Sequence, residues 1–186
     1  MKLIKVIIFL FISFSTPLVA NSNDDLQNLL SDGGKLIFIR HAYAPGSGDP
    51  DNFDLSNCAT QRNLNQEGID QAKTINKLFL ENYMDSSLVL SSEWCRCKKT
   101  AEYAFKNYET KKFLNSFFSK KFSQKKFKQI RELKYYIQKW DGKKNLIFVT
   151  HYVVILEILN LPIASGEIIV TDKELNILAR HITDKK

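Results

Sequence analysis

Two short apolar runs, each followed by a histidine, constrain the fold of this chain more than any other feature. Residues 35–39 follow two glycines and lead into Arg40-His41, and residues 145–150 lead directly into His151. Continuous apolar runs of this length, without polar alternation, are typical of strands that are buried on both faces. A sheet buried on both faces needs helices on each side, so these runs predict an α/β protein.

Helical segments alternate with such strands along the chain. Asn65 can cap an amphipathic segment at 66–80, and a helix at 93–106 follows a further strand at 87–90. From 127 to 140, apolar residues recur at steps of three and four, which indicates a helix with one buried face. The other expected elements are a short strand at 112–115, a helix at 153–159 and strands at 167–170 and 175–179. Together they predict a three-layer sandwich around a largely parallel central sheet.

The N-terminus differs from the rest of the chain. Lys2 and Lys5 precede an apolar run at 6–14, and small residues before Asn21 form a cleavage site. This order is typical of a secretory signal peptide. An uncleaved anchor is the alternative, but the run is shorter than the ~20 apolar residues that a membrane span needs. We therefore predict an exported protein, periplasmic or secreted, with a signal peptide at 1–20, a polar lead-in at 21–34 and one folded domain at 35–182.

The net charge and the cysteines indicate which kinds of ligand, disulfide and metal site this chain can have. Without the leader the chain keeps 25 basic and 20 acidic residues, and the basic excess lies between Lys111 and Lys144. Such a surface attracts anions, although a solvated helix face has the same composition. An exported chain with Cys58, Cys95 and Cys97 favours one disulfide, and the close spacing of the last two makes their mutual bridge poor. We expect Cys58 to pair with either of them, and we expect no metal, because zinc spacing is absent.

Four short motifs carry the residues suited to chemistry. Arg40-His41 and His151 each follow a predicted strand, and side chains gather at the carboxyl ends of such strands. Arg96 lies in the segment that opens the helix after 87–90. Leu64-Asn65-Gln66-Glu67-Gly68 opens the first helix of the domain. Each motif is weak alone, but their order along the chain is specific.

Together, these motifs resemble the signature of the histidine phosphatase superfamily, the phosphoglycerate-mutase-like phosphatases. That signature is Arg-His-Gly/Ala after the first strand, a Leu-Thr-x-x-Gly turn, a Ser-x-x-x-Arg-x-x-x-Thr-Ala segment and a later strand that ends in His. Ala42 in place of the commoner glycine and Asn65 in place of threonine are the departures. The resemblance spans about residues 35–170 and implies a histidine acid-type phosphatase with a phosphohistidine intermediate and no cofactor. A leader followed by a small domain of this kind also resembles the envelope branch whose members remove phosphate from lipopolysaccharide core heptose.

The chemistry of phosphoryl transfer assigns a role to each residue. A nucleophile must attack while fixed positive charge surrounds three equatorial oxygens. We expect His41 to be the nucleophile, kept neutral by neighbouring arginines. Arg40 and Arg96 donate in forked geometry, and His151 donates a further bond as imidazolium. Arg62 is an additional candidate for phosphate binding.

The loop at 44–54 leaves the first strand beside His41 and should border the pocket. Its carboxylates could bind sugar hydroxyls or donate a proton to a leaving group. The alternative, to which we give equal weight, is that the segment is a polar surface loop without a role in the site. Many relatives place a glutamate after the third strand, but residues 115–119 contain no acid. The candidate substrate-binding or proton-donating carboxylates are Asp49, Asp51, Asp54 and Glu167, with the loop aspartates favoured.

We expect a small phosphorylated substrate, which in an envelope enzyme is a phosphorylated sugar or glycolipid. We expect no nucleic-acid partner, and membrane contact only transiently through the signal peptide. The alternatives are a phosphoryl-transferring mutase of the same fold, a non-catalytic module that binds an anion, and a nucleic-acid or membrane binder. A leader argues against the mutase. The presence of all the motif residues argues against a non-catalytic module. A nucleic-acid or membrane binder would leave the combination of these residues to chance.

Overall fold

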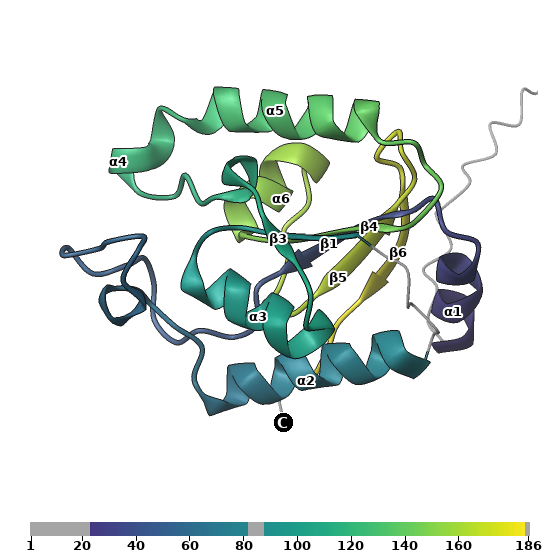
Figure 1. The fold of residues 1–186 in the computed structure, drawn as a ribbon, viewed down its shortest axis with the longest axis horizontal. Helices are drawn as coiled ribbons and strands as arrows, with labels where there is room; N and C mark the ends of the chain where they lie inside the picture. The colour runs from purple at the N-terminus through teal and green to yellow at the C-terminus, as the bar shows by residue number, and fades with distance from the viewer. Residues whose placement is uncertain (1–22, 82–87, 185–186) are drawn as a thin grey trace, which may run out of the picture.

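The computed structural model describes residues 23–81 and 88–184, so the predicted signal peptide at 1–20 lies outside the described residues. Its centre is a six-stranded sheet in the order β3-β2-β4-β1-β5-β6 (Figure 1). The first four strands in this order run parallel, and β5 is antiparallel to both of its neighbours. The strands are β1 (Leu36–Arg40), β2 (Leu88–Ser91), β3 (Glu109–Thr110), β4 (Leu146–Thr150), β5 (Ile168–Thr171) and β6 (Ile177–His181).

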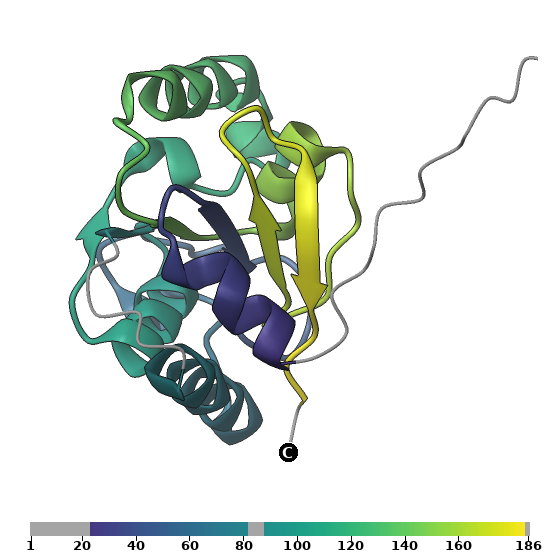
Figure 2. The ribbon, with the colours of Figure 1, turned by 90° about the vertical axis from the view of Figure 1, so that its right-hand side faces the viewer.

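Helices cover both faces of the sheet, which confirms the three-layer α/β sandwich. In Figure 1, α2 and α3 lie on one face and α5 and α6 on the other. Figure 2 shows α1 beside β6 at the edge of the molecule. The α-helices are α1 (Asn23–Ser31), α2 (Gln66–Glu81), α3 (Cys95–Phe105), α4 (Lys120–Ser123), α5 (Lys126–Lys139) and α6 (Tyr152–Leu159), and the 3-10 helices are η1 (Cys58–Thr60) and η2 (Lys112–Leu114). Among the described residues, no helix has the length and apolar character of a membrane span.

Strand β1 divides the hydrophobic core into two parts. Ile37 and Ile39 pack with the helices α1, α2 and α3, whereas Leu36 and Phe38 pack with α5 and α6. All four side chains are fully buried. Successive strand residues point to opposite faces, so a continuous apolar run is what a strand between two helical layers requires.

The local structure differs from the sequence interpretation in three places. Residues 112–114 form the 3-10 helix η2 instead of a strand, and the edge strand lies at Glu109–Thr110. The lead-in contains the helix α1, whose Leu26 and Leu30, four residues apart, are buried against the sheet. Phe127 is 80% exposed because the buried face of α5 begins only at the following turn. The predicted cap is confirmed, since Asn65 Oδ1 accepts the Gly68 N–H at 3.0 Å.

Candidate active site

The carboxyl ends of β1 and β4 bring the two histidines together. Arg40 pairs with Thr150 at the end of the parallel ladder, so a histidine is the next residue of each strand. The backbone N–H of His41 donates to the Thr150 carbonyl at 2.9 Å, which extends the ladder by one bond. The rings of His41 and His151 lie 5.5 Å apart between centroids, edge to face, and both are buried. The register of these adjacent parallel strands therefore brings the two histidines together.

His41 keeps one ring nitrogen free. Its Nδ1 lies 2.8 Å from the carbonyl oxygen of Ala42. A carbonyl oxygen only accepts, so Nδ1 carries the proton and Nε2 holds the lone pair. Burial lowers the pKa of His41 well below its usual value, and the charge of the Arg96 guanidinium lowers it further. The ring is therefore neutral at neutral pH, the form in which Nε2 is a nucleophile.

A chain of hydrogen bonds orients His151. Ser92 Oγ lies 2.9 Å from His151 Nε2 and 3.1 Å from Asn115 Oδ1. An amide oxygen only accepts, so the Ser92 hydroxyl donates to Asn115 and accepts from His151 Nε2–H. Burial, followed by the charge of Arg96, lowers the pKa of His151 well below its usual value. Burial therefore favours neutral His151, which differs from the expected imidazolium.

Two arginines of the site each keep a buried donor unpaired. Arg40 Nη1 donates to the Ile163 carbonyl at 2.9 Å, and Arg96 binds Asp49 through Nη1 and Nη2 at 2.6 and 3.3 Å. The Nε–H groups of Arg40 and Arg96 have no hydrogen-bond partner within residues 23–81 and 88–184. A buried donor without a partner costs stability, so such donors indicate a site for an anion.

Arg62 fastens the 44–54 loop over this site. Its Nε donates to the Gly48 carbonyl at 2.8 Å, and its Nη1 donates to the Ala44 carbonyl. Its backbone N–H donates to Asp49 Oδ1 at 3.1 Å. Burial is the main cause that lowers the pKa of Arg62, which lines the same cavity as the histidines. Arg62 therefore holds the loop and adds positive charge to the cavity.

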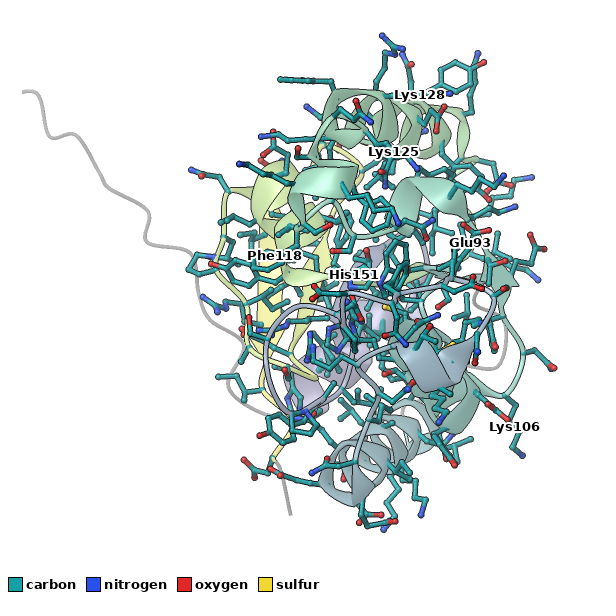
Figure 3. All side chains as sticks on the ribbon, turned by 90° about the vertical axis from the view of Figure 1, so that its left-hand side faces the viewer. Glu93, Lys106, Phe118, Lys125, Lys128 and His151 are labelled. Atoms are coloured by element: carbon teal, nitrogen blue, oxygen red, sulfur yellow. A yellow bond between two sulfur atoms is a disulfide. The ribbon has the colours of Figure 1, made fainter. Side chains whose placement is uncertain are left out.

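These side chains line one cavity of about 560 Å³, within the ~300–1,000 Å³ typical of small-molecule sites. Figure 3 faces this side of the molecule, with His151 near the centre of the view and Phe118 beside it. The cavity is lined by the predicted residues Arg40, His41, Arg62, Arg96 and His151. Its lining also includes Asp49, Asp51, Phe53, Trp94, Phe118, Lys120, Lys121, Phe122 and Tyr152.

No protein-family model matches the sequence, and curated proteins also give no match. Solved structures do match the fold. The protein histidine phosphatase SixA complexed with tungstate has a TM-score of 0.56 at 13% identity, over 77% of this chain and 92% of that one. The alpha-ribazole phosphatase from Shigella flexneri has a TM-score of 0.55 at 17% identity, over 74% of this chain and 90% of that one. A mycobacterial glucosyl-3-phosphoglycerate phosphatase has a TM-score of 0.51 at 14% identity, over 79% of this chain and 95% of that one.

The chain has the histidine phosphatase fold. All three matched structures carry this phosphoglycerate-mutase-like architecture, and each is covered over at least nine-tenths of its length. The fold places the ends of β1 and β4 side by side, which is where His41 and His151 lie. The fold predicted from the motifs is therefore confirmed.

Two of the predicted carboxylates lie in the cavity of this histidine phosphatase fold. Asp49 binds Arg96 through both oxygens, and its Oδ2 also accepts the Trp94 Nε1–H at 3.1 Å. Burial alone would raise the pKa of Asp49, but the bond to Arg96 holds it below its usual value. Asp51 lines the cavity too, and it forms no ion pair with any described residue. Asp49 is therefore held in an ion pair with Arg96, whereas Asp51 has no ion-pair partner among the described residues.

The other two carboxylates lie outside the cavity lining. Asp54 accepts the backbone N–H and the hydroxyl of Ser56 at 2.9 and 2.8 Å, and these bonds lower its pKa. Glu167 is 1% exposed and binds Arg180 at 2.5 Å. Asp54 and Glu167 therefore do not line the cavity, and each carboxylate is already bonded to other protein groups.

Sequence reasoning missed an aromatic wall of the cavity. Phe53 stacks on Trp94 with 5.2 Å between ring centroids, and Phe122 meets both rings edge to face. These residues come from the 44–54 loop, the residue before α3, and α4. Segments so far apart in the sequence share no local pattern, so only the folded chain reveals the contact. The wall gives the cavity an apolar surface next to its charged groups, since the Trp94 ring also lies 5.4 Å from the His151 ring.

Cys58 and Cys95 lie at bonding distance, with 5.7 Å between their Cα atoms, and Cys97 is free and buried. Of the two partners expected for Cys58, the structure thus pairs it with Cys95. The pair joins η1, just after the 44–54 loop, to the first residue of α3. Burial raises the pKa of Cys97 to about 12, so its thiol is protonated. No group of three or more potential metal ligands is clustered within the part of the chain that the structure describes.

Proposed function

We propose that this protein is a phosphohydrolase that takes a phosphoryl group from a phosphomonoester onto His41 and passes it to water. One observation supports this most directly. A neutral, buried His41 shares a cavity with Arg40 and Arg96, which keep unpaired buried N–H groups. Neutral imidazole is a nucleophile, and fixed guanidinium groups stabilise the oxygens of a phosphoryl group in transfer. The proposal includes no metal or other cofactor.

The reaction has two steps. First, His41 Nε2 attacks phosphorus, the bond from phosphorus to the leaving oxygen breaks, and that oxygen takes a proton from a carboxyl group. Second, water attacks the phosphohistidine, returns a proton to that carboxylate, and inorganic phosphate leaves as the nitrogen–phosphorus bond breaks. Arg40, Arg62 and Arg96 bind the non-bridging oxygens in both steps.

Asp51 is our candidate for the proton donor. A donor must carry a proton when the leaving oxygen departs, and the ion pair with Arg96 keeps Asp49 ionised. Asp51 lines the same cavity without an ion partner among the described residues. We therefore assign proton donation to Asp51, and to Asp49 the orientation of Arg96.

The proposed substrate is a phosphorylated sugar or glycolipid head group in the cell envelope. The leader-like residues 1–20 favour export, and the pairing of Cys58 with Cys95 suits an oxidising compartment. The aromatic wall offers an apolar surface to a sugar ring. Two proteins of the same fold are named as alpha-ribazole phosphatase and glucosyl-3-phosphoglycerate phosphatase, which also favours a small phosphoester.

A phosphate-release assay on the leaderless protein tests the proposal. We expect hydrolysis of p-nitrophenyl phosphate and of some sugar phosphates in the wild type, and none in His41→Ala. His181→Ala is the matched control, because His181 lies on β6 outside the cavity lining, and it should keep wild-type activity. Full activity in His41→Ala would contradict the proposal. Isomerised sugar phosphate without phosphate release would favour a mutase, and binding without turnover would favour a binding module.

A further inference from the structure

His151 has no part in the two proposed steps, yet a chain of three side chains holds its ring. Ser92 is fully buried, and its Oγ lies 2.9 Å from His151 Nε2 and 3.1 Å from Asn115 Oδ1. Asn115 contacts Glu93 in turn, because its Nδ2 lies 2.6 Å from Glu93 Oε2 and its Oδ1 lies 2.9 Å from the Glu93 backbone nitrogen. Figure 3 labels the two ends of this chain, Glu93 and His151.

The contacts with Glu93 fix the direction of the Asn115 amide. A backbone N–H only donates, so the Asn115 atom beside it is the oxygen, and the atom beside the Glu93 carboxylate is the NH₂ nitrogen. The single proton of the Ser92 hydroxyl is then used on Asn115 Oδ1. The Trp94 backbone N–H donates to Ser92 Oγ at 3.3 Å. Ser92 therefore accepts from His151 Nε2–H and has no proton left to donate to that ring.

This hydrogen-bond chain places the proton of neutral His151 on Nε2 and leaves the lone pair on Nδ1. His151 lines the cavity, whereas Ser92 and Asn115 do not, so Nδ1 is the ring nitrogen left for a bound phosphoryl group. Cys97 Sγ lies 3.5 Å from Nε2 and 4.0 Å from Nδ1. A thiol is only a weak donor, so Ser92 decides which nitrogen carries the proton.

The groups around His151 disfavour a second proton on the empty ring. Burial lowers the pKa of His151 most, and the charge of Arg96 lowers it further. The carboxylate of Asp49 is held by Arg96, and burial keeps the Cys97 thiol protonated. The charged and titratable groups beside the ring or in the same cavity lining are Arg40 and His41 at the end of β1, Asp49, Asp51 and Arg62 from the loop region, Arg96 and Cys97 in α3, and Tyr152 in α6.

We propose that Asn115 is a positioning residue that, through Ser92, holds the His151 proton on Nε2, so that a phosphoryl group binds at Nδ1 together with one proton. A monoanionic phosphoryl group donates its own O–H to Nδ1. A dianionic group repels the lone pair, and it binds when one proton from solvent joins Nδ1 and the phosphoryl oxygen. No bond to phosphorus changes in this step. The bound phosphoryl group rests on the proposed function, but the tautomer does not.

Nitrogen-15 spectra of the histidine rings report the tautomer without any ligand. We expect the proton of His151 on Nε2 in the wild type. Asn115→Leu frees the Ser92 hydroxyl to donate to Nε2, so we expect the proton on Nδ1 in that variant. Gln129→Leu is the matched control. Its amide donates to the carbonyls of Lys112 and Asn115 at 3.1 and 2.8 Å, which holds the same segment without contact to Ser92, and the wild-type tautomer should remain.

Calorimetric titration with inorganic phosphate, in buffers of different protonation enthalpy, counts the protons bound with the anion. At pH 8.5, where free phosphate is a dianion, the wild type and Gln129→Leu should take up about one proton per phosphate. The dissociation constant should then rise about tenfold from pH 8 to pH 9. Asn115→Leu should take up almost none, because Nδ1–H donates to the dianion directly, and its dissociation constant should change little. A proton taken up by Asp51 would persist in this variant.

A wild-type spectrum with the His151 proton on Nδ1 overturns the role of Asn115, and it does so even if Asn115→Leu does not fold. No phosphate binding or no proton uptake by the wild type overturns the linked proton. Equal uptake in the wild type and in folded Asn115→Leu, or the same changes in Gln129→Leu, also overturns the proposal. Circular dichroism and thermal unfolding establish the folding of both variants. Wild-type protein that binds phosphate with a proton but does not hydrolyse p-nitrophenyl phosphate keeps the role of Asn115 and refutes the phosphohydrolase.

Discussion

The ion pair between Glu167 and Arg180 supports Arg40 from outside the cavity. Glu167 Oε1 accepts from Arg180 Nη2 at 2.5 Å and from its Nε at 2.8 Å. Glu167 Oε2 accepts the backbone N–H of Ala164 at 2.7 Å, and the preceding residue, Ile163, offers the carbonyl that accepts from Arg40 Nη1 at 2.9 Å. The pair thus fixes the turn that orients Arg40, although Glu167 does not line the cavity.

Replacing Glu167 with glutamine should therefore lower both stability and activity. We expect a loss of about 2–3 kcal/mol in the free energy of unfolding, because one partner of a largely buried ion pair is removed. We expect kcat/KM for p-nitrophenyl phosphate to fall roughly tenfold, because Arg40 loses its fixed position. Urea unfolding and steady-state kinetics measure the two effects.

Glu109→Gln is the matched control for Glu167→Gln. Glu109 pairs with Lys111 at 2.9 Å, but its side chain is 61% exposed. Exposed pairs contribute less than about 1 kcal/mol, so this variant should leave stability and kcat/KM nearly unchanged. Wild-type kcat/KM in folded Glu167→Gln protein would contradict the link to Arg40.

Stability should fall as the pH falls below about 6.5, the usual pKa of an unfolded histidine. Burial lowers the folded-state pKa of His41 and His151, so the unfolded chain binds protons in this range and the folded chain does not. Each buried histidine then costs up to about 1.4 kcal/mol per pH unit as the pH falls, and nothing above the unfolded pKa. Urea unfolding between pH 5 and 8 measures the slope. His41→Asn should flatten it, and an unchanged slope in that variant would show that His41 is not the cause.

Asp51→Asn should lose activity mainly on substrates with poor leaving groups. General acid catalysis contributes ~10²–10⁴ in rate when the leaving oxygen needs a proton, and little when it does not. We expect alkyl phosphates to lose about 100-fold in kcat/KM and p-nitrophenyl phosphate to lose less than about threefold. Rates over a series of phosphates with graded leaving-group pKa measure this. Asp54→Asn, outside the cavity lining, should keep the wild-type dependence, and a uniform loss across the series in Asp51→Asn would count against the donor role.

A disulfide between Cys58 and Cys95 should stabilise the exported protein. The two residues are 37 positions apart, and closing a loop of that length contributes about 3–4 kcal/mol. Cys58→Ser should lose this amount and raise KM, because the end of the 44–54 loop is released from the helix that carries Arg96. Non-reduced peptide mapping should show Cys58 joined to Cys95, and Cys97→Ser should leave that link intact. Three thiols open to alkylation in unfolded, exported protein would rule the bond out.

The sequence was sufficient for the parts of the fold that local patterns control. The runs that became β1 and β4 are apolar on both faces, so their burial and their parallel pairing followed from composition. The positions of His41 and His151 followed in turn, because each is the next residue after a strand. The helix cap at Asn65 is likewise a local interaction between neighbouring residues.

The rest depends on contacts between distant segments. Nothing near Asp49 in the sequence marks it as the ion-pair partner of Arg96. Likewise, no local pattern predicts that Glu167 is buried in an ion pair with Arg180. The aromatic wall depends on how α4 packs against the 44–54 loop, which tertiary packing decides. Residues 112–114 look strand-like because of their apolar content, but they form a 3-10 turn beside the sheet edge.

Trapping the covalent intermediate tests the central proposal most directly. Wild-type protein mixed with p-nitrophenyl phosphate is denatured in alkali within milliseconds and digested, and the peptides are sequenced by mass spectrometry. We predict one phosphoryl group on His41, stable in alkali and released by acid, which is absent in His41→Asn and present in His181→Ala. Steady turnover with no phosphorylated His41, or with the phosphoryl group on His151 instead, would contradict the assignment of His41 as the nucleophile.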